Sequence, residues 1–374
     1  MTPHRIVLYI DTMHRGGAQR VMANIANYLI EKGWQVILVN DFEPDPNIMQ
    51  YPVSQRIQRV YLRKELQGNK IIKNIERLVS FRKLVKHERP DIILSFLGRP
   101  NKRMLLSTIG LSCKKVVSVR NDPNKEYGTS VLKRLTANVI FRFADGCVFQ
   151  TEEAKSYFSK AIQKKSKIIL NPVDDKFFNV ERSHNACDIV SIGRLEPQKN
   201  HELLIKAFSD IVQQGFKGRL IICGEGTLRE KLEELTNNMG IQDRVILTGN
   251  IMNVEKVLSE AKVFVLSSDY EGLPNSLMEA MAAGVPCVST DCPCGGPKFL
   301  IDDGTDGILI QCGNRRQLKE AIVETLRSKN AEEFGIRARH KAEMFRSSVI
   351  LSSWETFLLF RVCSTNQKHN KFNV

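Results

Sequence analysis

Two glutamates, Glu271 and Glu279, are the residues whose type and spacing most clearly point to chemistry. Glu271 follows residues 262–266, a short apolar run whose β-branched and aromatic composition predicts a buried strand. Glu279 falls in the apolar segment that ends at Gly284, which predicts a helix. We therefore expect one carboxylate in the loop after a strand and another in the next helix. Open α/β sheets bind their ligands at this edge.

The start of this predicted helix offers an anion site. Pro274 precedes Asn275, Ser276 and Leu277, whose backbone amides have no partner within the helix and lie at the positive end of its dipole. A phosphate held there would lie between two carboxylates, which suits a ligand with hydroxyl groups on both sides of a diphosphate. The alternative is a solvated glutamate beside an ordinary amphipathic helix. The strand, turn and cap that accompany the pair favour the site.

Two further segments place glycine and basic residues after predicted strands. Residues 188–192 lead into Gly193, Arg194 and Lys199, which combine close backbone approach with a bidentate cation and a point charge. Near the start of the chain, Gly16 and Gly17 separate strand 5–10 from a helix and would let backbone amides approach a phosphate. A surface ion pair at 194 and 199, and a simple tight turn at 16–17, are the alternatives.

Residues 269–286 resemble the paired-glutamate motif of the retaining nucleotide-sugar glycosyltransferases with the GT-B architecture, of the family 4 or group 1 type. This family includes bacterial exopolysaccharide, capsule and lipopolysaccharide transferases. The resemblance implies that Glu271 faces the donor sugar, that Glu279 binds the ribose, and that Arg194 and Lys199 hold the diphosphate. It also implies donor contacts, made by the residues Gly16, Gly17, Gly193, Ile251, Asn275, Ser276 and Leu277.

The acceptor side is less clearly marked. Arg120 and Asn121 begin a segment that resembles an Arg-Asn-Asp-Pro signature of exopolysaccharide-type members, and Arg99 lies in the predicted strand exit loop 97–102. The resemblance places Arg120 and Asn121 beside the acceptor, and we expect Arg99 on the acceptor side as well. The alternative at 120–124 is a proline-containing turn whose Asn and Asp side chains bond their own backbone. Gln19 departs from the glutamate that the family usually has in its first glycine loop.

The resemblance and the alternation of strands and helices predict an α/β fold of the GT-B type. It has two doubly wound Rossmann-like domains that face each other across a cleft. We expect an acceptor-binding domain at residues 1–171 and a donor-binding domain at 172–345. Residues 346–374 would form a C-terminal helix that crosses back to the N-terminal domain, and a tail. Residues 41–70 read as an irregular excursion and 184–187 as a linker.

Charge is distributed unevenly along the 374 residues. The net charge is +14, yet residues 1–185 hold 32 Lys and Arg against 17 Asp and Glu. Nucleic acid, an anionic membrane face and an acidic acceptor are candidate partners for such a surface. The basic helix expected at residues 71–87 would meet anionic lipid or form a solvated face. Aromatic residues are only 7% of the chain, which argues against a nucleic-acid platform.

The remaining features favour a cytoplasmic protein. The nine cysteines form no metal-binding or disulfide pattern, and we find no signal peptide or membrane-spanning run. Peripheral association with the cytoplasmic face of an anionic inner membrane stays open. No Asp-x-Asp follows a strand, so we expect neither a metal nor another cofactor.

We therefore expect a retaining hexosyl- or N-acetylhexosaminyltransferase in bacterial surface polysaccharide biosynthesis. It would use a nucleoside diphosphate sugar, most simply a UDP-sugar, and a glycan or lipid-linked saccharide acceptor. An epimerase or phosphorylase with the same fold is one alternative, although a phosphorylase of the glycogen type needs a pyridoxal lysine and a longer chain. A basic nucleic-acid-binding protein is an alternative from another class.

Overall fold

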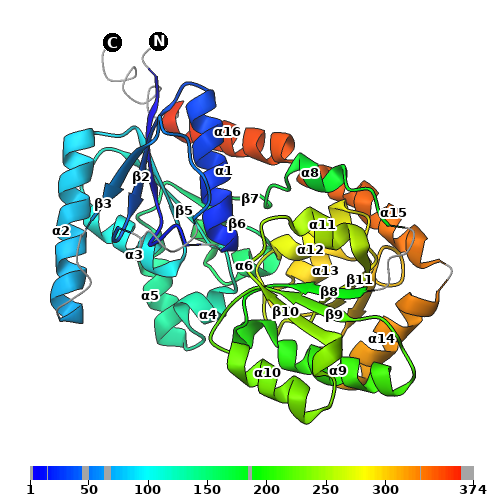
Figure 1. Ribbon diagram of the computed structural model, residues 1–374. Coiled ribbons are helices and arrows are strands. Elements are labelled where there is room, and N and C mark those ends of the chain that lie inside the picture. Colours follow the sequence, from blue (N-terminus) through cyan, green and yellow to red (C-terminus); the bar gives the residue numbers. More distant parts are fainter. Residues whose placement is uncertain are drawn as a thin grey trace. The chain divides into compact units, whose positions relative to one another are not determined.

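The computed structural model describes residues 3–14, 16–43, 50–62, 69–183, 188–328 and 330–363. The chain divides into two compact units (Figure 1). Unit 1 comprises Met1–Pro172 with Ser348–Val374, and unit 2 comprises Val173–Ser347. Each unit is built on one parallel β-sheet with helices on both faces, which confirms the predicted α/β fold class.

The sheet of unit 1 has seven parallel strands in the order β3-β2-β1-β4-β5-β6-β7. Its central strands β1 and β4 are mostly apolar and, apart from Arg5, buried, as expected of strands covered on both faces. The strands are β1 (Arg5–Tyr9), β2 (Gln35–Asn40), β3 (Gln58–Tyr61), β4 (Ile92–Phe96), β5 (Lys114–Ser118), β6 (Gly146–Phe149) and β7 (Ser166–Ile168).

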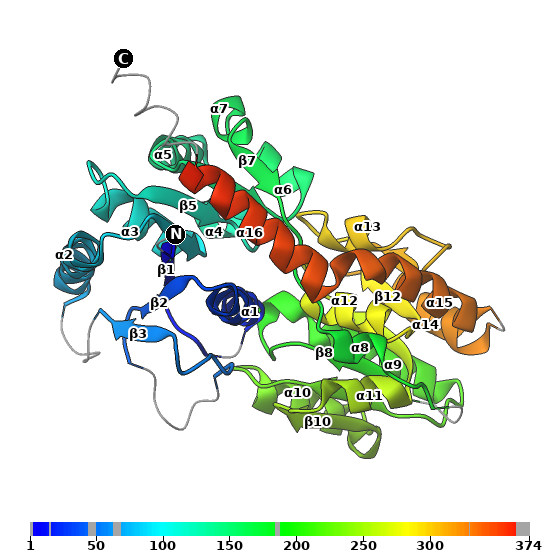
Figure 2. The same ribbon diagram turned by 90° about the horizontal axis from the view of Figure 1, so that it is seen from above.

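Two sets of helices cover this sheet. One face packs against α1 (Gly17–Glu31) and α16 (Ser347–Cys363), which share a core with β1, β2 and β4. The other face carries α2 (Lys70–Glu88), α3 (Gly98–Ser107) and α5 (Val131–Phe141), as Figure 2 shows. The short helices α4 (Pro123–Tyr127), α6 (Glu152–Ser156) and α7 (Lys160–Gln163) complete the unit. The packing of α16 on unit 1 confirms the predicted return of the C-terminal helix.

The sheet of unit 2 has six parallel strands in the order β10-β9-β8-β11-β12-β13. In both sheets the chain starts in the middle, builds outward in one direction, and then returns to build in the other, which is the doubly wound pattern. The strands are β8 (Asp188–Ile192), β9 (Leu220–Cys223), β10 (Val245–Gly249), β11 (Ala261–Leu266), β12 (Cys287–Thr290) and β13 (Ile308–Ile310).

The helices of unit 2 also form two layers. Helices α9 (His201–Gln213) and α14 (Arg315–Arg327) pack together over a core of β8, β9, β11 and β12 side chains. Helix α12 (Asn275–Ala282) packs on α8 (Asp175–Phe178) and α15 (Ala331–Ala342). The other helices are α10 (Arg229–Asn238), α11 (Val254–Glu260), α13 (Gly296–Leu300) and the 3-10 turns at Pro197–Lys199, Gln242–Arg244 and Glu343–Phe345.

Three local expectations are wrong. The excursion at residues 41–70 contains strand β3, an edge strand too short and polar to show alternation, although 44–49 and 63–68 lie outside the described residues. The expected loop 97–102 is the first part of α3, and residues 123–127 are helical. Glycine and proline suggested loops there, yet both residues are tolerated in the first turn of a helix. The expected linker 184–187 and the tail from residue 364 lie outside the described residues.

Candidate active site

The strands β8 and β11 are neighbours in the middle of the unit 2 sheet, where the strand order changes direction. The loops that leave their carboxyl ends diverge to opposite sides of such a sheet and leave room for a ligand between them. Residues 193–200 form the exit of β8, and residues 267–274 form the exit of β11. The donor-side residues predicted at 193, 194, 199 and 271 therefore all follow these two strands.

Glu271 is held by side chains from both loops. Its Oε1 accepts hydrogen bonds from Lys199 Nζ at 2.5 Å and from Ser268 Oγ at 2.7 Å, and its Oε2 lies 3.4 Å from Gln198 Nε2. The residue is 6% exposed. A carboxylate with so little access to water requires such partners. Glu271 is therefore fixed in place and charge-paired before any ligand arrives.

The backbone around Glu271 is anchored to the segment before α13. The amide of Glu271 donates to Pro293 O at 2.6 Å, and the amide of Cys294 donates to Glu271 O at 2.8 Å. A Cβ added to Gly296 would lie 1.7 Å from the carbonyl oxygen of Gly272. Because no side chain could fit there, glycine at 296 allows the two segments to lie directly against each other.

Lys199 reaches Glu271 from the end of a 3-10 turn. Its carbonyl accepts a hydrogen bond from Ser267 Oγ at 2.9 Å, and its side chain runs over Gly193, where a Cβ would lie 3.1 Å from the Lys199 methylenes. The next residue, Asn200, is in the left-handed region and caps α9 by accepting from the amide of Leu203. Gly193 and Lys199 are thus brought together with Glu271.

Arg194 is exposed at the same strand end, and its Nη2 lies 3.4 Å from Gln198 Oε1. Its backbone rests on two glycines from the exit of β9. A Cβ at Gly224 would lie 2.0 Å from Gly193 O, and one at Gly226 would lie 2.4 Å from Leu195 O. These glycines hold the loop that carries Arg194, while the Arg194 guanidinium faces solvent.

Helix α12 begins directly after the exit loop of β11, and its N-cap residue, Pro274, makes no side-chain cap hydrogen bond. Asn275 and Ser276 are partly exposed, whereas Leu277 and Glu279 are buried. The predicted helix start is therefore present, and Glu279 lies in its second turn. Ile251 is partly exposed just after β10, whose last residue Gly249 pairs with Gly224.

His201 is buried at the first position of α9, two residues after Lys199. Burial and the positive charge of Lys199 lower the pKa of His201 from 6.5 to about 4, and the carbonyls of Gly193 and Arg194 partly oppose this. The imidazole is consequently neutral at physiological pH and adds no positive charge next to Lys199. No pattern in the sequence singled out this residue.

The residues predicted in unit 1 do not share one environment. Gly16 is the N-cap of α1 in an extended conformation, and Gly17 is the first residue of the helix. Arg99 is exposed in the first turn of α3. These positions follow β1 and β4, which are neighbours in the sheet, so they lie at its carboxyl edge.

Arg120 and Asn121 are bonded within unit 1. The Arg120 guanidinium is buried over the Phe96 ring, 4.7 Å from its centroid, and donates to Asn171 Oδ1. Asn121 Oδ1 accepts from the amide of Asp122 at 2.9 Å. These contacts resemble those of the self-bonded turn that the sequence left as an alternative. Burial lowers the pKa of Arg120 to about 9.

Two family models match the chain. Residues 173–341 match the model of the glycosyl transferases group 1, and residues 15–177 match that of glycosyltransferase family 4. The two matches together run from residue 15 to residue 341. The chain belongs to these glycosyltransferase families.

One similar relative of this glycosyltransferase is an enzyme of Campylobacter jejuni. It is named GalNAc-alpha-(1->4)-GalNAc-alpha-(1->3)-diNAcBac-PP-undecaprenol alpha-1,4-N-acetyl-D-galactosaminyltransferase and is 27% identical over 364 residues, which are 94% of this chain and 97% of the relative. Among solved structures, sucrose-phosphate synthase from Thermosynechococcus elongatus has a TM-score of 0.77 at 18% identity, over 99% of both chains. HepE from Anabaena, in complex with UDP and glucose, has a TM-score of 0.77 at 17% identity, over 95% of this chain and 99% of HepE. The structural likenesses confirm the GT-B fold.

The described part of the glycosyltransferase contains no cluster of three His, Cys, Asp or Glu residues arranged to hold a metal ion. Six of its cysteines are buried and two, Cys312 and Cys363, are exposed, all as free thiols in that part of the chain. Across the same residues, no helix combines the length and apolar character needed to span a bilayer.

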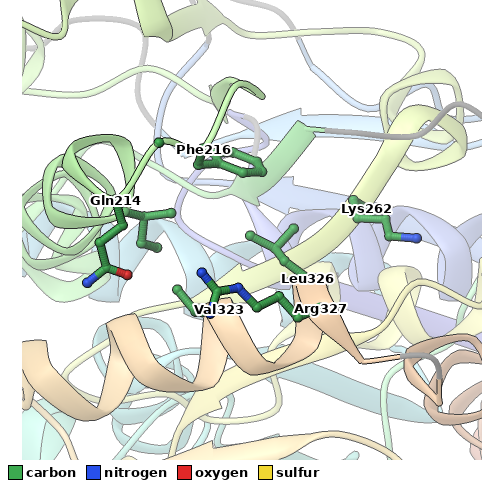
Figure 3. Close-up of a pocket in the computed structure, with 8 residues that line it drawn as sticks. Gln214, Phe216, Lys262, Val323, Leu326 and Arg327 are labelled. Atoms are coloured by element: carbon green, nitrogen blue, oxygen red, sulfur yellow. The ribbon is translucent and has the colours of Figure 1, made fainter.

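A hollow of about 350 Å³ opens at the other edge of the unit 2 sheet (Figure 3). Its lining comes from the end of α9, the start of β11 and the end of α14, and includes Phe216, Lys262 and Leu326. These residues lie at the amino ends of the strands. The hollow therefore contains none of the candidate site residues of the glycosyltransferase.

The residues that support the site could not be recognised from the sequence. Ser268 and Gln198 hold Glu271, and neither stood out because a serine and a glutamine have no characteristic spacing. Gly224 and Gly226 lie against the loop that carries Arg194, a role that their sequence alone does not indicate. The signal that could have found them is their position directly after a predicted strand next to β8.

Proposed function

We propose that this glycosyltransferase uses a nucleoside diphosphate sugar, in the simplest case a UDP-sugar, and retains the configuration at the anomeric carbon. The observation that carries the proposal is the pair of Lys199 and Glu271, joined at 2.5 Å where the loops of β8 and β11 meet. An ammonium group has three donors, so Lys199 can bind Glu271 and a phosphate oxygen at once. The exposed guanidinium of Arg194 supplies a second, bidentate donor.

In the proposed reaction, the acceptor hydroxyl attacks C1 of the sugar from the side on which the diphosphate departs. A bond forms between the acceptor oxygen and C1, the bond from C1 to the phosphate oxygen breaks, and the acceptor proton passes to that oxygen. Arg194, Lys199 and the amides at the start of α12 stabilise the leaving diphosphate, and Glu271 orients the sugar. Positioning and fixed charge account for most of the rate.

For the acceptor we propose a glycan or a lipid-linked saccharide of a bacterial surface polysaccharide pathway. The name of the Campylobacter relative specifies an undecaprenol-linked saccharide and an N-acetylhexosamine. A hexose or an N-acetylhexosamine is therefore the donor sugar to test first. We also propose that the protein works at the cytoplasmic face of an anionic membrane and that it needs no metal ion. Arg194, Lys199 and the start of α12 would offset the charge of a diphosphate without one.

The test is a binding and turnover screen with UDP-, GDP- and ADP-sugars, with and without EDTA. We expect selective binding of one UDP-sugar that EDTA does not change. Lys199→Ala should weaken this binding about tenfold or more because it removes a charge-assisted hydrogen bond. Glu271→Ala should reduce turnover. The matched control is Lys217→Ala, which removes an exposed lysine of the same unit and should leave binding unchanged.

Three outcomes would contradict the proposal. Failure of every nucleotide sugar to bind at millimolar concentration would exclude the donor class. Equal effects of Lys199→Ala and Lys217→Ala would exclude the site. Inversion of the anomeric configuration, read by NMR of the product, would exclude the retaining mechanism, and release of an epimerised nucleotide sugar would favour the epimerase alternative.

A further inference from the structure

The face of unit 1 formed by α2, α3 and α5 exposes an unusual amount of apolar side chain. Of the seventeen large hydrophobic residues that are exposed in the described part of the chain, ten lie on or directly after these three helices. They are Ile72, Ile75, Val79, Leu106, Ile109, Val131, Leu132, Leu135, Val139 and Phe143. We call this set the α2–α3–α5 surface. Exposed apolar residues gathered in this way mark an interaction site, whereas scattered ones do not.

Helix α5 contributes most to the surface. Val131, Leu135 and Val139 follow one another at intervals of four and are 75%, 57% and 55% exposed, so they form one stripe along the helix. The opposite side of α5 holds Ala137 and Phe141, both fully buried against the rest of unit 1. The helix therefore has an apolar face in the core and a second apolar face in solvent. The second face contributes nothing to the fold of unit 1.

The three helices form one continuous face. In Figure 2 they lie side by side on the same side of the unit 1 sheet, and α3 packs against both α2 and α5. Arg82 of α2 donates from Nη1 to Ser107 O and Ile109 O, each at 2.8 Å, which fixes α2 to the end of α3. Ile72, Ile75 and Val79 on α2 share one outward side at spacings of three and four.

The segment that carries this surface is strongly basic. Residues 70–143 contain 17 Lys and Arg against 5 Asp and Glu. Lys83 and Lys86 on α2 and Lys133 on α5 are exposed beside the apolar stripes. Apolar side chains that enter a lipid headgroup layer, flanked by cations that meet anionic headgroups, are the two features by which a helix lies on a membrane.

We propose that the α2–α3–α5 surface docks on an anionic lipid bilayer, with α5 inserted at the headgroup boundary. A second copy of the chain fits less well, because it would bring the same excess of positive charge against itself. Nucleic acid also fits less well, since nine of the ten exposed residues are aliphatic and offer no ring for a base to stack on. The inference extends the proposed function to the membrane where a lipid-linked acceptor would reside.

The test is co-sedimentation of the full chain with vesicles of phosphatidylcholine alone and of phosphatidylcholine with phosphatidylglycerol. We expect binding to the anionic vesicles, weakened by salt. The double variant Leu132→Glu/Leu135→Glu should lower the partition coefficient about tenfold or more, because it places two carboxylates in the headgroup layer. Both positions are exposed, so the fold should be unaffected. Ile336→Glu, at a position of unit 2 that is 68% exposed, is the matched control and should bind as the wild type does.

Sedimentation velocity without lipid provides the second readout. A monomer that binds anionic vesicles through Leu132 and Leu135 supports the proposal. The proposal is overturned if the protein binds no vesicle, or if the double variant binds vesicles as tightly as Ile336→Glu does. It is also overturned if the wild type forms a dimer without lipid and the double variant dissociates this dimer. UDP-sugar binding, measured on the same variants, should stay unchanged. Loss of membrane binding is thereby distinguished from failure of the proposed enzymatic function.

Discussion

At the scale of single residues, the candidate site is assembled before a ligand binds. Lys199, Ser268 and Gln198 hold the Glu271 carboxylate, and the Lys199 stem lies against Gly193. A preorganised charge pair loses little side-chain entropy when the ligand arrives, so more of the binding energy is available to the reacting groups. The site therefore depends on residues that need never touch the ligand.

His201 makes the stability of unit 2 depend on pH. Its folded pKa of about 4 lies below the unfolded value of 6.5, so the unfolded chain binds the extra proton between these values. The contribution of neutral His201 to the free energy of unfolding is present above pH 6.5 and decreases as the pH falls toward 4. We expect the free energy of unfolding to decrease by about 2 kcal/mol between pH 7 and pH 5. Urea unfolding at the two pH values measures it.

The variant His201→Gln should remove most of this decrease, because glutamine does not titrate. His87→Gln, at an exposed position of α2, is the control and should leave the decrease unchanged. An identical pH dependence in wild type and His201→Gln would show that the acid sensitivity arises elsewhere in the chain.

At the scale of elements, glycines determine how closely the loops of unit 2 approach one another. Gly296→Ala places a Cβ 1.7 Å from Gly272 O, next to Glu271, so the loop must move. We expect a loss of stability of about 1–3 kcal/mol and weaker donor binding. Thermal unfolding and titration with the bound nucleotide sugar measure the two effects.

Gly240→Ala is the matched control for this prediction. Gly240 has φ of +66° and open space around its Cα, so alanine costs about 1–2 kcal/mol of backbone strain without any clash. Its donor binding should match that of the wild type. If both variants bound the donor equally well, the contact at Gly296 would have no role in the site.

Most elements could be predicted because buried parallel strands are continuous apolar runs, as residues 262–266 show. The failures occurred where local composition and tertiary context disagree. Helix α3 begins with a glycine and soon meets Pro100, so its sequence resembled a loop. Strand β3 is a short, partly exposed edge strand with little pattern of its own. Its pairing with β2 depends on neighbours that are distant in the sequence.

The site was predictable to the same extent as its strands. The position of Glu271 followed from a strand, a turn and a helix that are contiguous in the chain. The contact of Glu271 with Gln198 joins residues that are 73 positions apart and depends on two loops meeting at one sheet edge. The outward apolar stripe of α5 was also missed, because periodicity gives an apolar face but not whether it is covered.

At the scale of the whole molecule, unit 1 is made from two separate parts of the chain. Helix α16 enters its core after unit 2 is complete, and the Trp354 side chain is fully buried against Phe96, with ring centroids 5.7 Å apart. The last helix is therefore an integral part of the first unit. Its contribution to the stability of unit 1 can be measured with substitutions in α16 that leave both β-sheets unchanged.

Trp354→Ala should destabilise unit 1 by about 3–5 kcal/mol, because it removes a large buried ring and leaves a cavity. Phe360→Ala, three residues before the end of the same helix and 64% exposed, should change stability by less than about 0.5 kcal/mol. Scanning calorimetry should show the loss in one transition while the transition of unit 2 stays in place. Equal shifts for the two variants would contradict the assignment of α16 to the core.

Because α16 is the last element of unit 1 to be synthesised, it affects how the chain folds during translation. Synthesis proceeds from the N-terminus, so β1, β2 and β4 leave the ribosome long before the helix that covers them. The intervening residues 173–347 take on the order of 10–35 s to translate. During that interval the nascent first unit presents an uncovered apolar face, while the second unit can already close its own core. Chaperones that bind nascent chains should therefore engage the first unit and release it only after residue 363 has emerged.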